Sequence, residues 1–154
     1  MKAVVQRARN ASITVDGNIT GAIKRGLLVY LGVAAEDTSK DSVWMAEKVA
    51  NLRIFEDSQG KMNLSIKDLV NENPVGILAV SQFTLLGDVT NGRRPYYGAA
   101  AEPVKARELY EHFMEEIRKQ GLICEAGIFQ ARMDVSYINE GPVTILLDSR
   151  LGVK

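Results

Sequence analysis

The sequence predicts one α/β domain in which two main helices pack on a mixed β-sheet. Strand patterns come before, between and after two helix patterns, and this interleaving of strands with two helices is typical of a mixed sheet. The chain has 154 residues, which is the usual length of one domain. Its composition, 46% apolar and 25% charged, is ordinary for a globular protein. We therefore expect residues 1–154 to form a single domain.

The first third of the chain carries strand patterns. Residues 12–15 alternate between polar and apolar side chains, and the Asp16-Gly17-Asn18 sequence that follows is typical of a hairpin turn. Residues 27–33 are nearly all apolar, which suits a strand buried on both faces. The strands expected here are 3–8, 12–15, 19–23 and 27–33.

Two later segments have the spacing of amphipathic helices. Apolar residues recur at helical intervals between Val43 and Ala50, behind the N-cap candidates of residues 37–39, and predict a helix over 39–52. A second apolar stripe predicts a helix over 103–120. Pro103 suits its first turn, and Gly121 suits its C-terminal end.

The remaining elements are shorter. Residues 76–83 form the strongest central strand, because they are almost uninterruptedly apolar. Loops are expected where Gly, Pro and Asn concentrate, over 71–74 and 86–98. Further strands are expected over 53–55, 123–126, 134–138 and 143–147.

Charge and cysteine content exclude several classes of protein. The 19 basic and 19 acidic residues cancel, which argues against a polycationic nucleic-acid coat and against a membrane-surface module bound by bulk charge. Cys124 is the only cysteine, so no internal disulfide can form, and a reduced, cytoplasmic compartment is expected. The sequence after Met1 has no signal-peptide pattern, and the longest apolar stretch, residues 27–35, is too short to cross a membrane.

The usual catalytic side chains are scarce. His112 is the only histidine, and its acidic neighbours place it on the solvated face of the second helix, which argues against a Ser-His-Asp or Cys-His site. Cys124 lies in an expected strand and suits a core position. Asp134 and Asp148 lie at strand ends without a pairing pattern, and no metal-ligand spacing or phosphate-binding glycine loop is present.

Two segments remain as candidates for a site. Residues 81–85 (Ser-Gln-Phe-Thr-Leu) follow the strongest strand, a position where binding sites are common, although Ser81 and Thr84 also suit plain loop capping. Residues 139–144 (Asn-Glu-Gly-Pro-Val-Thr) interrupt two strand patterns with Gly141-Pro142, which also suits an ordinary turn or edge strand.

Together these two segments make the chain resemble the D-aminoacyl-tRNA deacylases, which remove D-amino acids from mischarged tRNA. The first family signature stands here as residues 81–85 and the second as residues 139–144. The resemblance covers essentially the whole chain in order. Further matching segments are Val4-Val5-Gln6-Arg7, Asn51-Leu52-Arg53-Ile54-Phe55, Gly60-Lys61-Met62-Asn63 and Gly92-Arg93-Arg94-Pro95.

The resemblance implies a barrel-like β-sheet core, a homodimer, and an active site at the subunit interface. The implied substrates are D-aminoacyl-tRNA and glycyl-tRNA, whose ester bond is hydrolysed without a cofactor or a metal. No membrane partner is implied.

The resemblance also assigns roles to residues. Phe83 and Thr84 present backbone N–H groups to the ester carbonyl, while Ser81 and Gln82 shape the pocket. A Gly141–Pro142 peptide in the cis form enters the partner's pocket and rejects L-amino acids. The expected supporting residues are Arg7, Asn139 and Met133, and the expected tRNA phosphate contacts are Arg93 and Arg94.

The chain departs from the family pattern at two places. Tyr96-Tyr97 stands where the family often has Ser-Phe, and residues 130–133 (Gln-Ala-Arg-Met) replace a Gly-Ala-Asp-Met run beside the adenosine pocket. Arg132 therefore puts the detail of the adenosine contacts in question, but not the reaction class. Two other functions stay open: a tRNA-binding dimer without catalysis, and a small-molecule esterase that uses Thr84 as its nucleophile.

Overall fold

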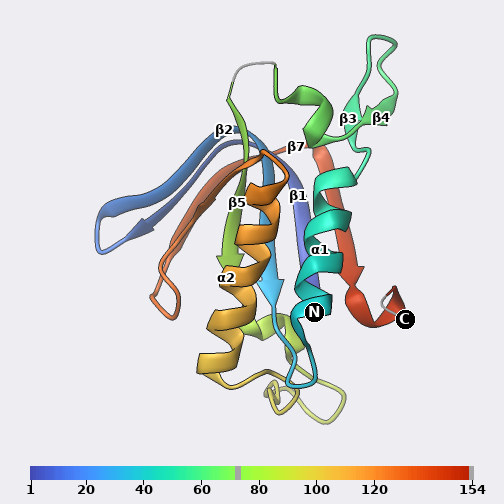
Figure 1. The fold of residues 1–154 in the computed structure, drawn as a ribbon. Helices are drawn as coiled ribbons and strands as arrows, with labels where there is room; N and C mark the ends of the chain where they lie inside the picture. Colours follow the sequence, from blue (N-terminus) through green and yellow to red (C-terminus); the bar gives the residue numbers. More distant parts are fainter. Residues whose placement is uncertain (72–73, 153–154) are drawn as a thin grey trace.

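The computed structural model describes residues 1–71 and 74–152, so two residues of the loop expected over 71–74 lie outside the described residues. Within the described ranges, five strands form one mixed sheet, with two main helices (Figure 1). The mixed α/β fold predicted from the sequence is confirmed. The strand order is β6 (Ile123–Ala126), β5 (Val75–Ser81), β2 (Asn18–Gly32), β1 (Lys2–Val15) and β7 (Asp134–Asp148).

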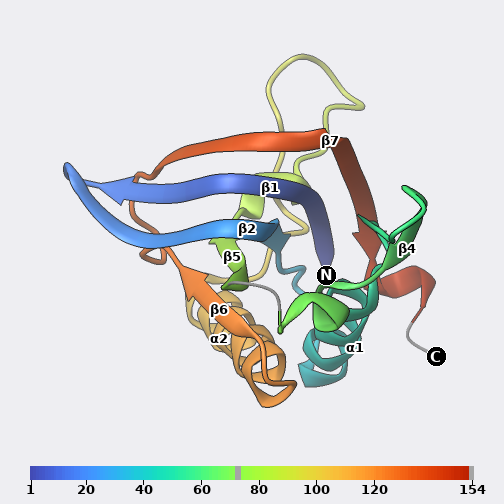
Figure 2. The same ribbon diagram turned by 90° about the horizontal axis from the view of Figure 1, so that it is seen from above.

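Pairing in the sheet is antiparallel on one side and parallel on the other. β1 lies antiparallel to both β2 and β7, whereas β5 lies parallel to both β2 and β6. β6 and β7 are thus the two edges of the sheet in the described chain. Figure 2 shows β1 and β7 bending as they cross the molecule. The short strands β3 (Phe55–Glu56) and β4 (Met62–Leu64) form a separate antiparallel ladder.

The hairpin between β1 and β2 follows from local turn chemistry. Asp16 and Gly17 have φ of 48° and 79°, and a two-residue type I′ turn requires positive φ at both positions. The four short strands expected in this region are, however, two long ones. Asn10, with φ of 50°, accompanies an irregularity in the pairing of β1 with β7. The ladder continues past this irregularity. The polar residues that interrupt the apolar pattern therefore lie within long strands and do not mark strand ends.

Helices α1 (Ser39–Asn51) and α2 (Pro103–Lys119) lie side by side on one face of the sheet (Figures 1 and 2). α1 begins with a capping box, in which the backbone N–H of Thr38 donates to the Asp41 carboxylate at 2.8 Å. Pro103 occupies the first turn of α2, as the sequence predicts. Neither described helix is long and apolar enough to cross a membrane.

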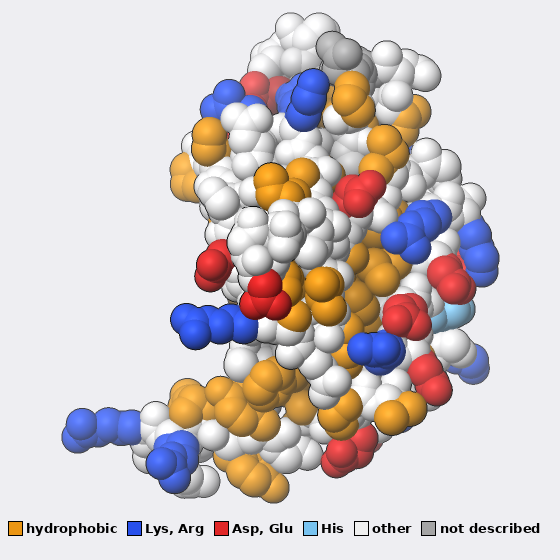
Figure 3. All heavy atoms as spheres, turned by 90° about the vertical axis from the view of Figure 1, so that its left-hand side faces the viewer, with side chains coloured by type: hydrophobic (Ala, Val, Ile, Leu, Met, Phe, Trp, Pro, Cys, Tyr) orange, Lys and Arg blue, Asp and Glu red, His pale blue; other side chains and the backbone are white. Residues whose placement is uncertain are grey.

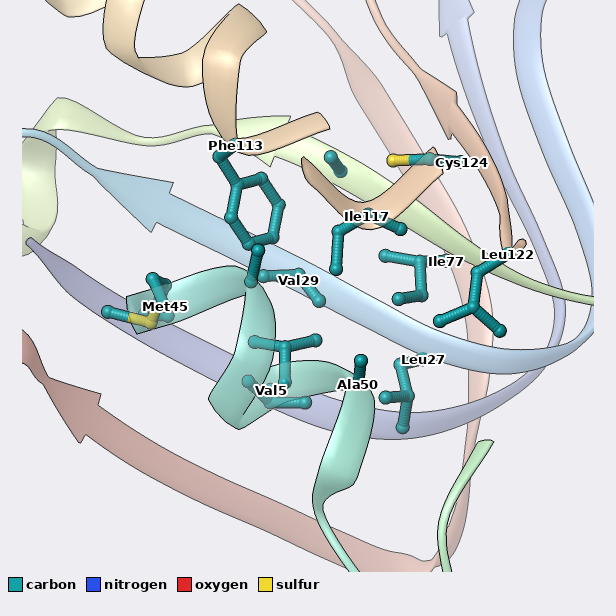
Figure 4. Close-up of a cluster of buried hydrophobic side chains, with 14 of the residues drawn as sticks. Val5, Leu27, Val29, Met45, Ala50, Ile77, Phe113, Ile117, Leu122 and Cys124 are labelled. Carbon is teal, nitrogen blue, oxygen red and sulfur yellow. The ribbon is translucent and has the colours of Figure 1, made fainter. Parts of the chain in front are cut away.

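The main core fills the space between the helices and the sheet. In Figure 4, Val5, Val29 and Ile77 from the strands meet Met45 of α1 and Phe113 of α2, and all five side chains are fully buried. Burying each such side chain contributes about 1.5–3 kcal/mol. This layer fixes β5, and therefore fixes the turn that follows it.

Three expectations about boundaries are wrong. β5 ends at Ser81 instead of residue 83, because the chain turns into the 3-10 segment η2 (Phe83–Leu86). The strands expected over 134–138 and 143–147 are one strand, β7, which continues through the Gly-Pro interruption as a bulge. The strand expected over 53–55 begins at residue 55. Two further 3-10 segments are η1 (Ile66–Leu69) and η3 (Ser149–Leu151).

Candidate active site

A cavity of about 560 Å³ opens where β5 ends. Its walls come from four parts of the chain that are distant in sequence: the end of β2, the Ser81–Phe83 turn, the N-terminal half of α2 with the residues before it, and the loop between β6 and β7. The surface that Figure 3 draws shows hydrophobic side chains gathered around the hollow of this face, with basic side chains projecting at its lower end. The lining that the argument uses consists of Ser81, Gln82, Phe83, Tyr110, Phe129 and Met133.

The turn after β5 is held by backbone hydrogen bonds. The N–H of Gln82 donates to the carbonyl of Leu31 at 2.8 Å, which keeps the chain beside β2 as β5 ends. The N–H of Leu85 then donates to the carbonyl of Gln82 at 3.2 Å. In a 3-10 turn the first N–H groups have no acceptor within the turn, and in η2 these belong to Phe83 and Thr84.

Two side chains at the turn, those of Phe83 and Thr84, are exposed. Phe83 is 59% exposed and makes an edge-to-face contact with Tyr97, with ring centroids 5.0 Å apart. The Thr84 hydroxyl accepts a hydrogen bond from the side-chain amide of Gln82. Thr84 is exposed and does not line the cavity, whereas Ser81, Gln82 and Phe83 do.

The second signature forms a bulge on β7. Ala8 pairs with Asn139 and Gln6 with Thr144, so residues 140–143 stand opposite the single residue Arg7. The side-chain oxygen of Asn139 accepts from the N–H of Val143 at 3.2 Å, which closes the bulge. Asn139 therefore braces the loop that carries Gly141 and Pro142, both of which are exposed.

Arg7 lies under this loop and is only 6% exposed. Its Nε donates to the carbonyl of Glu140 at 3.2 Å, and its Nη1 donates to the carbonyl of Ile54 at 2.8 Å. Gly141 has φ of 124°, and a Cβ there would lie 3.0 Å from Nη2 of Arg7. Only glycine fits comfortably in this position. The Gly141–Pro142 peptide bond is cis.

The two signatures are far apart within one chain. Ser81 pairs with Leu31, Leu31 with Ala3, and Ala3 with Leu147. Residues 140–143 stand opposite Arg7, which is four positions along β1 from Ala3. On a regular sheet this separates Gly141 from Ser81 by about 13 Å along the strands and about 14 Å across them. The cavity of one chain therefore does not contain its own Gly141-Pro142 loop.

The other predicted residues are dispersed. Met133 lines the cavity, directly before β7. Arg93 and Arg94 are exposed in the loop between η2 and α2, whose base is closed by a pair of backbone hydrogen bonds between Asp88 and Tyr96, both 2.8 Å long.

Sequence reasoning missed the aromatic part of the cavity. Tyr110 belongs to the apolar stripe of α2 and is buried, but it also lines the cavity and donates its hydroxyl to the carbonyl of Ala79 at 2.9 Å. Phe129 lies beside it, with ring centroids 6.0 Å apart, and carries Arg107 over its face at 5.2 Å. No sequence pattern pairs these residues, because their contact depends on how α2 docks.

Two titratable side chains considered in the sequence lie outside the cavity lining. Burial raises the pKa of the Cys124 thiol to about 12, so this side chain is a neutral core residue at physiological pH. His112 is half-buried between α1 and α2 instead of fully solvated, with Nε2 3.6 Å from Glu116. Among the described residues, no group of three or more His, Cys, Asp and Glu side chains is placed to hold a metal ion.

Comparison with known proteins defines the class of this protein. The family model described as D-Tyr-tRNA(Tyr) deacylase matches residues 4–148. The chain is similar to the D-aminoacyl-tRNA deacylase of Koribacter versatilis, at 57% identity over 97% of this chain and 98% of that protein. It is likewise similar to the D-aminoacyl-tRNA deacylase of Desulfotalea psychrophila, at 56% identity over 97% of each chain.

The chain is also similar in fold to a solved structure. The structure titled c-Myc DNA Unwinding Element Binding Protein superposes with a TM-score of 0.87 at 43% identity, over 96% of this chain and 98% of that chain. The chain therefore belongs to the D-Tyr-tRNA(Tyr) deacylase family. It is an enzyme of the D-aminoacyl-tRNA deacylase kind, a hydrolase, as the resemblance of its two signatures implies.

Proposed function

We propose that this chain hydrolyses the ester bond between a D-amino acid and the 3′ end of tRNA, and that it does so in the cytoplasm without a cofactor. The observation that carries the proposal is the cavity in which the Ser81–Phe83 turn faces Tyr110 and Phe129. A volume of about 560 Å³ suits a nucleoside, and aromatic rings stack on any nucleobase. We place the terminal adenosine of tRNA in this cavity, with the aminoacyl ester at the Ser81–Phe83 turn.

The chemistry needs few side chains. An aminoacyl ester is already activated, and the neighbouring ribose hydroxyl helps to orient the attacking water. Holding the ester in position contributes up to about 7–11 kcal/mol in favourable cases. The backbone N–H groups of Phe83 and Thr84 stabilise the oxyanion, and one such donor is worth about 2.7–4 kcal/mol. A histidine base is not required by this mechanism.

Nucleophilic attack by Thr84 is less well supported. A hydroxyl becomes a good nucleophile when a nearby base accepts its proton. The Thr84 hydroxyl instead accepts a hydrogen bond from the Gln82 amide, which donates protons and does not take them up. We therefore assign Gln82 and Ser81 to holding the turn, and we assign the backbone of Thr84, not its hydroxyl, to the reaction.

We further propose that the enzyme is a homodimer whose sheets complete a barrel-like core. An apolar row formed by Leu146, Val4 and Tyr30 crosses the sheet on the face opposite the helices, where Leu146 pairs with Val4 and Val4 with Tyr30. Val4 and Tyr30 are half-buried, and Leu146 is 76% exposed. A second copy packed on this row buries it and brings a second Gly141-Pro142 loop to the cavity.

The partner's loop supplies chiral selection. D-amino acids share only the direction in which the side chain leaves Cα. A rigid backbone wall placed where an L side chain points excludes every L-amino acid and accepts every D-amino acid. Gly141 and Pro142 suit this wall because they are exposed, lack bulky flexible side chains, and are braced by Arg7. Glycine has no side chain to exclude, so glycyl-tRNA is also a substrate.

The test uses one tRNA charged with D-tyrosine and, in parallel, D-tyrosine ethyl ester without tRNA. We expect rapid hydrolysis of the charged tRNA and little turnover of the ethyl ester, because the adenosine supplies the binding. Equal turnover of both would favour a small-molecule esterase. Binding of the charged tRNA without hydrolysis would favour a tRNA-binding protein without catalysis.

A further inference from the structure

Three arginines surround one carboxylate beside the Gly141-Pro142 loop. The Glu140 carboxylate lies 3.6 Å from Nε of Arg9, 3.8 Å from Nε of Arg25, and 4.0 Å from Nε of Arg7. Its Oε2 atom is buried and has no hydrogen-bond partner in the described part of the chain. A buried carboxylate oxygen without hydrogen bonds is costly unless nearby positive charge compensates it. The guanidinium groups therefore stabilise Glu140, and Glu140 stabilises them.

The sheet register places two like charges beside this carboxylate. Arg9 of β1 pairs directly with Arg25 of β2. Side chains that face each other in this way have Cβ atoms about 4.5–5.5 Å apart, and like charges in such a pair are destabilising. Glu140 reaches the pair from β7, with Oε1 near Arg9 and Oε2 near Arg25. One carboxylate thus lies between two guanidinium groups and weakens the repulsion between them.

The same residue is part of the chiral loop. The backbone carbonyl of Glu140 accepts the Arg7 hydrogen bond, and the next residue is Gly141. A second carboxylate near Arg7, that of Glu56, lies 3.8 Å from Nη2 and is largely exposed. Glu140 therefore supplies the more buried negative charge at Arg7, and it fixes the start of the loop by both its backbone and its side chain.

Resting on the proposed role of the loop, we infer that Glu140 is a positioning residue for chiral selection. It acts through charge balance: its carboxylate offsets Arg7, Arg9 and Arg25, and this holds the wall formed by Gly141 and Pro142 at the position where it excludes L-amino acids. Glu140 itself does not touch the substrate. Glu140 thus sets how strictly the enzyme distinguishes D-amino acids from L-amino acids.

The experiment compares the rates at which excess enzyme hydrolyses one tRNA charged with L-tyrosine or with D-tyrosine. Glu140→Gln keeps the shape and removes the charge. We expect its L-to-D rate ratio to rise at least about tenfold, since a misplacement of an ångström changes rates by up to about a hundredfold. Glu108→Gln, an exposed change on α2, is the matched control and leaves the ratio at the wild-type value.

A charge-balanced double variant separates this role from simple packing. Adding Arg25→Gln to Glu140→Gln removes the repulsion from Arg9, so we expect the L-to-D ratio to return toward the wild-type value. If Glu140→Gln does not fold, Glu140→Asp takes its place, because it keeps the charge but withdraws it by one methylene. A ratio equal to that of the control in the variant used would overturn the inference.

A parallel variant, Pro142→Ala, tests the loop itself. If Pro142→Ala admits L-tyrosine and Glu140→Gln does not, the loop is the wall but Glu140 does not position it, and only this inference fails. If Pro142→Ala leaves the exclusion of L-tyrosine intact, the proposed role of the loop fails as well.

Discussion

The side-chain amide of Gln82 donates a hydrogen bond to the hydroxyl of Thr84, across the first turn of η2, at 2.5 Å. This contact orients the hydroxyl oxygen as an acceptor and provides no group to remove its proton. The contact also links the residues on either side of Phe83. Phe83 and Thr84 are the residues whose backbone N–H groups we assign to the oxyanion. The relationship suggests a structural part for the Thr84 hydroxyl and a chemical part for its N–H.

The first prediction concerns Thr84→Ala. The backbone N–H remains in this variant, so we expect the deacylation rate to fall by no more than about tenfold, whereas loss of a nucleophile costs several powers of ten. Single-turnover hydrolysis of D-tyrosyl-tRNA measures the effect, with Ser58→Ala, an exposed hydroxyl in the turn between β3 and β4, as the control. A drop of a thousandfold or more would favour the Thr84 nucleophile.

A second prediction concerns assembly. Leu146→Asp places a charge in the apolar row that we assign to the dimer interface, and the symmetry of a dimer places it there twice. We expect sedimentation to show a monomer that has lost most of its activity, because truncating or charging a central interface residue costs about 2–4 kcal/mol. Ile19→Asp, at the exposed tip of the hairpin, keeps the dimer. A fully active wild-type monomer would contradict the account.

Salt dependence tests the exposed loop. If Arg93 and Arg94 contact tRNA phosphates, each Arg→Ala change lowers the slope of log affinity against log salt by about 0.7–0.9. Titration of tRNA at several salt concentrations measures this slope, and the exposed Lys40→Ala is the control. An unchanged slope in the double variant would assign this loop a structural role.

Thiol chemistry gives a fourth prediction. Burial raises the pKa of Cys124 to about 12, and a thiol with a raised pKa forms the reactive thiolate only as the pH rises toward that value. At pH 8 this thiol is therefore almost entirely protonated. We expect iodoacetamide at this pH to leave the activity of the folded enzyme intact, with denatured enzyme as the labelled control. Rapid inhibition that parallels labelling of Cys124 would show that this thiol matters to the reaction.

Local chemistry explains which parts of the fold could be predicted from the sequence. The Asp16-Gly17 turn was predictable because its positive φ angles favour those residue types. The helices were predictable from apolar spacing and from caps such as Thr38 and Pro103. The end of β5 was not, because Phe83 continues the apolar run, and the turn depends on the hydrogen bond from Gln82 to Leu31 on a neighbouring strand.

The candidate site also has one part that the sequence predicts and one part that it does not. The two signatures predict Ser81–Thr84 and Gly141-Pro142 as site residues, and their roles stay predictions. The aromatic wall of the cavity was missed, since Tyr110 and Phe129 meet only when α2 and the loop before β7 are packed together. The cluster around Glu140 was also missed. It requires the pairing of Arg9 with Arg25, and that register is a property of the sheet and not of any segment.

The measurement that tests the central claim most directly is the hydrolysis of one tRNA charged in parallel with D-tyrosine, L-tyrosine or glycine. A backbone wall that rejects only an L side chain predicts that D-tyrosyl-tRNA and glycyl-tRNA are both hydrolysed, while L-tyrosyl-tRNA is spared. Glycyl-tRNA that resists the enzyme as fully as L-tyrosyl-tRNA does would contradict the account, because glycine has no side chain for the Gly141-Pro142 loop to exclude.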